Sequence, residues 1–169
     1  KIMDIVARWP GSCHDQTIFD NSAAKFKFET GVIRGYYLLG DGGYEVTPYL
    51  MTPILNPTSR AQQLYNESHI RTRNVIERCF GVLKKRFPVL SKGMTVHIDN
   101  TQAVIVACAV LHNICRDMHD DLPNSINEDM SDADDDQVSD TENDDAYVPN
   151  LRGRQERDRI IRDYFANLE

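Results

Sequence analysis

Two carboxylates have the type and position to do chemistry together. Asp41 comes directly after a short apolar run in "YYLLGDGGYEV", and Gly42 and Gly43 follow it. Glu77 lies further along the chain in "VIERCFG", with 35 residues between the two acids. Carboxylate oxygens from separate elements can bind a divalent cation such as Mg²⁺. The pair therefore becomes a candidate site if the fold brings Asp41 and Glu77 together.

Each acid also has an ordinary structural explanation. Asp is common in turns, because its side chain accepts hydrogen bonds from nearby backbone N–H groups. Glu77 follows Arg73 by four residues, a spacing at which helices form ion pairs worth about 0.2–0.5 kcal/mol. Gly81, one turn after Glu77, costs a helix about 1 kcal/mol relative to Ala and could clear space beside Glu77. Spacing alone leaves both explanations open.

Six basic residues lie on or near the segment that contains Glu77: Arg71, Arg73, Arg78, Lys84, Lys85 and Arg86. A solvated helix face is one explanation for them. Beside a metal site they would instead neutralise DNA phosphates, and DNA binding would then weaken steeply with salt. The sequence has no signature for reading base edges, so we expect sequence recognition to lie elsewhere or in a partner.

His14 and Asp15 follow a turn at residues 10–12 and form a second candidate pair. Both could line a metal site, yet Asp15 is equally suited to cap the next helix and His14 to pack or hydrogen-bond beside it. A different hydrolase, with Ser12 or Cys13 as the nucleophile, is a further hypothesis. It is the weakest, because adjacent residues on one turn seldom converge on a single reacting atom.

Three short runs predict the strands of the fold: residues 1–10, 36–40 and 49–55. Residues 36–40 are wholly apolar, as in strands that are buried on both faces. Pro48 and Pro53 confine the third run to an edge or to a shorter strand. Because ligands bind beyond the carboxyl ends of strands in α/β sheets, Asp41 stands in a suitable place.

Helices are predicted between and after these strands. One runs from Asp15, as its cap, to about Ala24, with Ile18 and Phe19 facing inward. A longer one begins at a capping box, residues 59–62, and ends at Pro88. Residues 101–116 are apolar almost all round, which predicts a helix central to the core. Strands that alternate with helices predict an α/β fold with a mixed sheet.

A last helix is predicted near the C-terminus. Its apolar residues should dock back on the body of the protein; they are Ile160, Ile161, Tyr164, Phe165 and Leu168.

Length and composition limit the class of protein. The chain has 169 residues, 41% of them hydrophobic, which suffices for one ordinary core. It has no run of about 18 apolar residues and no basic-then-apolar start, so we expect neither a membrane span nor a signal peptide. Its four cysteines are Cys13, Cys79, Cys108 and Cys115, with no C-x-x-C spacing, as is typical of reduced thiols in an intracellular protein.

The net charge of -7 is unevenly distributed. Residues 117–146 contain 13 Asp or Glu and no Lys or Arg, whereas residues 1–116 carry a balance of +5. Such a strip buries too little apolar surface to offset its ordering entropy, which predicts a disordered linker over 119–147. The same strip could instead compete with a polyanion for the basic body. The predicted organisation is a body at 1–118, this linker, and a helical segment at 148–169.

Several separated blocks resemble one family in the correct order: "RWPGSCHD", "LLGDGGYEVTPYLMTP", "YNESHIRTRNVIERCFGVLKKRF" and "LHN". They are similar to the catalytic domain of PIF/Harbinger transposases and of the nucleases derived from them. The resemblance covers residues 1 to about 118 and resumes in the terminal "RDRIIRDYF".

This resemblance implies a fold, a cofactor and roles for the acids. The fold would be an RNase H-like mixed sheet flanked by helices, incomplete at the N-terminus. By resemblance, Asp41 and Glu77 match the second and third acids of an Asp-Asp-Glu triad that binds Mg²⁺ or Mn²⁺. The pair His14 and Asp15 also occurs in the family block, which makes Asp15 a candidate for a further ligand and His14 a candidate beside it, with the structural explanations for both still open. The first Asp would lie upstream of these 169 residues, because Asp4 matches a later strand of the family.

The resemblance further implies a DDE-type endonuclease that hydrolyses DNA phosphodiester bonds with two metal ions, although these 169 residues alone are expected to have little or no activity. DNA would be the substrate, and a Myb-like protein would supply targeting. The expected location is the nucleus, with the cytoplasm as a second site. The alternative is a domesticated, inactive nuclear DNA-binding or scaffold protein.

Overall fold

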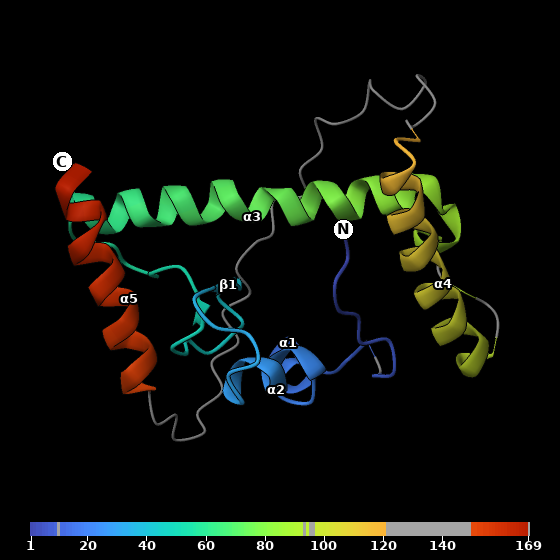
Figure 1. The fold of residues 1–169 in the computed structure, drawn as a ribbon, viewed down its shortest axis with the longest axis horizontal. Helices are drawn as coiled ribbons and strands as arrows, with labels where there is room; N and C mark the ends of the chain where they lie inside the picture. The colour runs from blue at the N-terminus through green and yellow to red at the C-terminus, as the bar shows by residue number, and fades with distance from the viewer. Residues whose placement is uncertain (10, 93, 95–96, 121–149, 169) are drawn as a thin grey trace. The chain divides into compact units, whose positions relative to one another are not determined.

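The computed structural model describes residues 1–9, 11–92, 94, 97–120 and 150–168 (Figure 1). They fall into two compact units, and the boundary lies within one long helix. The sheet unit comprises the described residues of Ser12–Val75 together with 150–168. The α4 unit comprises those of Lys1–Gly11 together with 76–120. The predicted α/β class is confirmed, with helices and a small two-stranded sheet.

The sheet unit begins with two short helices rather than the predicted single one. After a turn at Gly11 and Ser12, α1 spans Asp15–Asp20 and α2 spans Ala23–Glu29. Asp15 is the first helical residue and not the cap, which is His14 and makes no side-chain cap bond. The helix breaks because Ser22 starts a new one, its hydroxyl accepting a hydrogen bond from the Lys25 N–H at 3.1 Å.

The sheet consists of β1 (Leu38–Leu39) and β2 (Leu50–Met51), paired in parallel. Leu38 lies opposite Leu50, and Leu39 lies opposite Met51. The third predicted strand is therefore confirmed in a shorter form, between its two prolines. The prediction that β1 is buried on both faces is wrong, because Leu38 is half-buried and Leu39 is exposed. In the described residues β2 is the only strand beside β1, so one neighbour covers it.

The long helix α3 spans Arg60–Arg86, close to its predicted limits. Its capping box is present: the Gln62 N–H donates to the Ser59 hydroxyl at 3.2 Å, and the Ser59 N–H donates to the side-chain Oε1 of Gln62 at 3.4 Å. At the other end Pro88 starts a short 3₁₀ turn, η1 (Pro88–Leu90). Local sequence signals therefore set both ends of α3.

The C-terminal helix α5 (Leu151–Asp163) and the 3₁₀ turn η3 (Phe165–Leu168) pack on the start of α3 (Figure 1). Ile161 and Phe165 share a buried cluster with Ala61 and Tyr65. The predicted docking is thus confirmed for the middle of the apolar face. Tyr164 and Leu168 are exposed instead, because only one side of this C-terminal segment packs against α3.

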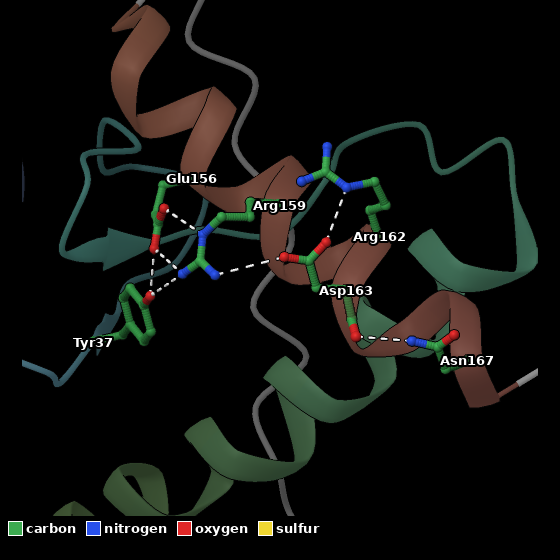
Figure 2. A network of polar contacts seen from close by, with 6 residues as sticks. All are labelled: Tyr37, Glu156, Arg159, Arg162, Asp163 and Asn167. Atoms are coloured by element: carbon green, nitrogen blue, oxygen red, sulfur yellow. Dashed lines mark hydrogen bonds and ion pairs between the residues drawn. The ribbon is translucent and has the colours of Figure 1, made fainter.

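A polar network links α5 to Tyr37 (Figure 2). Arg159 donates to both oxygens of Glu156, at 2.7 and 2.9 Å, and to the Tyr37 hydroxyl at 3.2 Å. Tyr37 in turn donates to Glu156. These bonds hold the pKa of Glu156 down at about 2, first through Arg159 and then through Tyr37. The network joins α5 to the residue before β1.

In the α4 unit, α4 (Ile98–Asp117) lies beside the C-terminal end of α3 (Figure 1). It is not the central core helix that was predicted: Cys108, Ala109 and His112 are buried, whereas Val110 is 52% exposed. The described part of this unit covers α4 on one side, through contacts such as Cys79 Sγ to His112 Nε2 at 3.7 Å. A helix that is apolar on every face is buried only on the sides against which other elements pack.

The strand predicted over residues 1–10 is absent: the described residues 1–9 form no strand. The backbone of Ile2 bonds to a side chain instead: its N–H donates to Asn113 Oδ1, and its carbonyl accepts from Asn113 Nδ2, both at 2.8 Å. His112 and Asn113 of the "LHN" block are therefore structural contacts within this unit.

Three further predictions concern the cysteines, membrane spans and the acidic linker. All four cysteines are free thiols, as predicted. In the part of the chain that the structure covers, no helix is long and apolar enough to cross a membrane. The predicted acidic linker lies outside the described residues, apart from its first two.

Candidate functional site

Asp41 lies directly beyond the paired part of β1. The Gly40 N–H donates to the Met51 carbonyl at 2.9 Å, which is the last contact between the strands, and Asp41 is the next residue. Its side chain folds over the following turn, and Oδ1 accepts a hydrogen bond from the Gly43 N–H at 2.9 Å. A Cβ added at Gly42 would meet nothing within 4 Å, so the backbone beside Asp41 is accessible.

The second oxygen of Asp41 faces a cation. Arg73 Nη1 lies 3.3 Å from Asp41 Oδ2, and the two side chains are 21% and 47% exposed. Sequence patterns suggest Arg73 as a partner of Glu77, four residues later, and as one of six basic residues for DNA contact. The structure shows that Arg73 also reaches across to the sheet, a contact between residues 32 positions apart.

Hydrogen bonds from α3 to the strand position Arg73. Tyr65 donates its hydroxyl to the Thr52 carbonyl at 2.9 Å, and His69 Nε2 lies 3.1 Å from the Met51 carbonyl. A carbonyl only accepts, so Nε2 bears the hydrogen. His69 is 4% exposed, and its burial lowers its pKa. Arg73 follows His69 by one helical turn and therefore projects from the same face.

Tyr44 completes the surroundings of Asp41. Its ring packs so closely on Gly40 that a Cβ there would lie 2.9 Å from a ring carbon, and it meets Phe19 edge-on at 6.0 Å. Burial, together with the charges of Asp15 and Asp41, raises the pKa of Tyr44 to about 12, and the charge of Arg73 partly opposes this rise. The phenol therefore remains an O–H donor at neutral pH.

Asp15 belongs to the same neighbourhood, because its charge acts on Tyr44 together with that of Asp41. Its side chain is exposed at the start of α1. His14 is exposed beside it. The structure thus brings Asp15 towards the surroundings of Asp41 through Tyr44, and it gives no metal-binding contact for His14.

Glu77 is an exposed residue of α3 in the α4 unit. Because the two units are separate bodies, the pairing of Glu77 with Asp41 stays a prediction. The exposed basic residues around it are Arg71, Arg78 and Lys84, and Lys85 is half-buried. Arg86 is already engaged: its guanidinium binds the Asp120 side chain and donates to the Asp120 carbonyl at 2.8 Å.

A divalent cation suits Asp41 only as part of a larger set of ligands. Its oxygens are of the kind that Mg²⁺ prefers, and one of them already faces a cationic group. Across the described ranges, however, no three His, Cys, Asp or Glu side chains gather closely enough to hold a metal ion. Further ligands would be needed to complete a site.

The sequence patterns did not identify His69 and Tyr44 as residues of the site. A signal for His69 existed, because His69, Arg73 and Glu77 recur every four residues, which places them on one helix face. Tyr44 gave no signal, since its packing on Gly40 and Phe19 depends on the tertiary structure.

The sequence is similar to a known family over most of its length. A family described as DDE superfamily endonuclease matches residues 1–113. The Homo sapiens protein HARBI1, whose name marks it as a candidate nuclease, is 37% identical over 116 residues, which are 67% of this chain and 33% of that protein. The chain spans about a third of the length of the curated relatives it matches.

Two plant proteins are also similar. The Arabidopsis thaliana protein ALP1-like is 30% identical over 150 residues, which are 78% of this chain and 37% of that protein. Another A. thaliana protein, named Antagonist of Like Heterochromatin Protein 1, is 28% identical over 155 residues, 79% of this chain and 39% of that protein. No solved structure matches.

Proposed function

Because this chain belongs to the DDE superfamily endonucleases, we propose that it forms part of an RNase H-like domain that hydrolyses DNA phosphodiester bonds, with Asp41 and Glu77 as two of three acidic metal ligands. The observation that supports this most directly is the position of Asp41. It stands at the carboxyl end of a strand, accessible to solvent and facing a cationic side chain. The remaining ligand, the first Asp of the triad, would come from the part of the protein beyond these 169 residues.

Each side chain has a distinct task in this proposal. Asp41 offers its oxygens from the end of β1, and Glu77 offers its own from α3. Divalent metal ions, when bound to such acids, activate an attacking water and stabilise the leaving oxygen. Asp15 is the candidate for an additional ligand, since its charge already reaches the phenol beside Asp41.

Neighbouring groups would position the DNA. Arg78 and Lys84 are exposed on the helix that contains Glu77, where they can neutralise backbone phosphates. Tyr44, still protonated at neutral pH, can donate its hydroxyl hydrogen to an oxygen near Asp41. Arg71 and Lys85 extend the basic face, whereas Arg86 would first have to leave Asp120.

A second function, without catalysis, is favoured by one observation. One A. thaliana relative is named as an antagonist of a heterochromatin protein, and its name contains no reference to cleavage. The domain would then serve as a nuclear DNA-binding or scaffold protein. Under either function we propose a nuclear location and a Myb-like targeting partner, both of which rest on the family resemblance alone.

A cleavage assay on the full-length protein separates the two functions. Supercoiled DNA would be incubated with Mg²⁺ or Mn²⁺ and the wild-type protein, Asp41→Asn or Glu77→Gln. We expect nicking by the wild type and a loss of at least about a hundredfold in each variant, in line with the removal of a group that acts in the transition state. Glu67→Gln, another exposed acid of α3, is the matched control.

Equal nicking by all four proteins would exclude the assigned roles. Absence of nicking by the wild type, with DNA binding intact, would favour the scaffold function.

A further inference from the structure

We propose that Arg73 is a built-in counter-ion for Asp41, which holds this carboxylate when no metal is bound and which an incoming divalent cation must displace. This inference rests on the proposed role of Asp41 as a metal ligand. In this role Arg73 positions the Asp41 side chain. The role is separate from the contact with DNA phosphate that the charge of Arg73 would also allow.

Both oxygens of Asp41 already have a partner. Oδ1 accepts the Gly43 N–H at 2.9 Å, and Oδ2 faces Arg73 Nη1 at 3.3 Å. A cation that binds Oδ2 would come close to the guanidinium, and two positive charges at such a distance repel each other. Metal binding and the Arg73 contact therefore compete for the same oxygen.

Arg73 is held in this position by the fold. One turn before it, the buried His69 bonds to the Met51 carbonyl at 3.1 Å. The same carbonyl accepts the Gly40 N–H at 2.9 Å, and Gly40 precedes Asp41. One backbone oxygen of β2 thus fixes both the helix face that presents Arg73 and the strand end that presents Asp41.

The exposure of the pair sets the strength of this competition. Asp41 is 47% exposed and Arg73 21%, so water screens their attraction in part. A pair of this kind is worth up to about 1 kcal/mol, and 1.4 kcal/mol corresponds to a factor of ten in affinity. Removal of Arg73 should therefore tighten cation binding at Asp41 about fivefold.

Mn²⁺ binding to the full-length protein tests the inference without any need for catalysis. Free Mn²⁺ would be measured by electron paramagnetic resonance during titration of the wild type, Arg73→Gln, Asp41→Asn and the double variant. Other carboxylates of the chain contribute equally to all four proteins, so the difference from Asp41→Asn isolates binding at Asp41. We expect this binding to be about fivefold tighter in Arg73→Gln, with no gain in the Asp41→Asn background.

Two further variants test whether the charge of Arg73 is the cause. Arg60→Gln removes the same charge from the same helix, at a residue paired with Glu67, and should leave Mn²⁺ binding unchanged. Arg73→Lys keeps a cation and should stay within about twofold of the wild type. Equally tight binding by Arg73→Lys and Arg73→Gln would contradict the role of the charge.

The possible failures are distinguishable. If Asp41→Asn weakens Mn²⁺ binding but Arg73→Gln equals the wild type, the counter-ion role is wrong and Asp41 remains a ligand. If Asp41→Asn changes nothing, Asp41 is no ligand, and the proposed function fails together with this inference.

Discussion

Two helical glycines, Gly153 in α5 and Gly81 in α3, should respond in opposite ways to the same substitution. Gly153 lies at a close approach of backbones: an added Cβ would be 2.3 Å from the Val46 carbonyl oxygen and 2.7 Å from the Thr47 Cα. Backbone atoms cannot rotate away, so α5 would have to move. At Gly81, an added Cβ would meet nothing within 4 Å.

The magnitudes follow from two opposing effects. Ala favours a helix over Gly by up to about 1 kcal/mol. Forcing an extra carbon into a packed site costs about 1–3 kcal/mol, and the short contacts at Gly153 place it at the upper end of this range. Gly153→Ala should therefore destabilise the α5 contact by about 2 kcal/mol, whereas Gly81→Ala should stabilise α3 by about 1 kcal/mol.

Hydrogen exchange measured by mass spectrometry reports on each helix separately. A loss of about 2 kcal/mol corresponds to roughly thirtyfold faster exchange of the amides in α5. Gly81→Ala should slow the exchange of amides around residue 81 about fivefold. Unchanged or slower exchange of α5 in Gly153→Ala would refute the reasoning, because helix propensity would then outweigh the contact with Val46.

Three further predictions concern the α5 contact and the start of α3. Phe165→Ala should lower the free energy of unfolding of the sheet unit by about 3 kcal/mol in urea titrations, because the ring is buried and meets Tyr65 edge-on. Leu168 is exposed, so the control variant Leu168→Ala should change this free energy by less than about 0.5 kcal/mol. Ser59→Ala should cost about 1 kcal/mol in thermal denaturation followed by circular dichroism, since the Gln62 N–H loses its acceptor. The pKa of Glu156 falls from 4.5 to about 2 in the folded state, so its contribution is complete above pH 4.5 and is lost as the pH falls through about 2. Protection of the α5 amides, taken relative to their intrinsic exchange rates at each pH, should fall over this range in the wild type, and Glu156→Gln should show no such fall.

Much of the local structure was predictable, because its signals act over a few residues. The capping box at Ser59 starts α3, and Pro88 ends it. Pro48 and Pro53 confine β2 to two residues between them. Asp41 could be placed at a strand end for the same reason, since an apolar run stops at a carboxylate and two glycines. These features depend on chain stiffness and on backbone hydrogen bonds within one turn.

The errors arose where a segment needs a distant partner. Residues 1–8 have the pattern of a strand, but a strand forms only beside another strand, and Asn113 bonds to this backbone instead. The helix α4 is apolar all round yet partly exposed, because burial depends on which elements cover it. The residue pattern of one segment does not show which other elements will pack against it.

The sequence by itself determined the chemical inventory: the acids Asp41 and Glu77, the basic residues around them, and the cap and proline that limit α3. Only the tertiary structure decided which of these groups meet. Arg73 faces Asp41 because His69 and Gly40 bond to the same Met51 carbonyl, an arrangement that links three segments distant in the chain. Spacing along a helix predicts its neighbours one turn away, whereas contacts between elements depend on how their backbones pack.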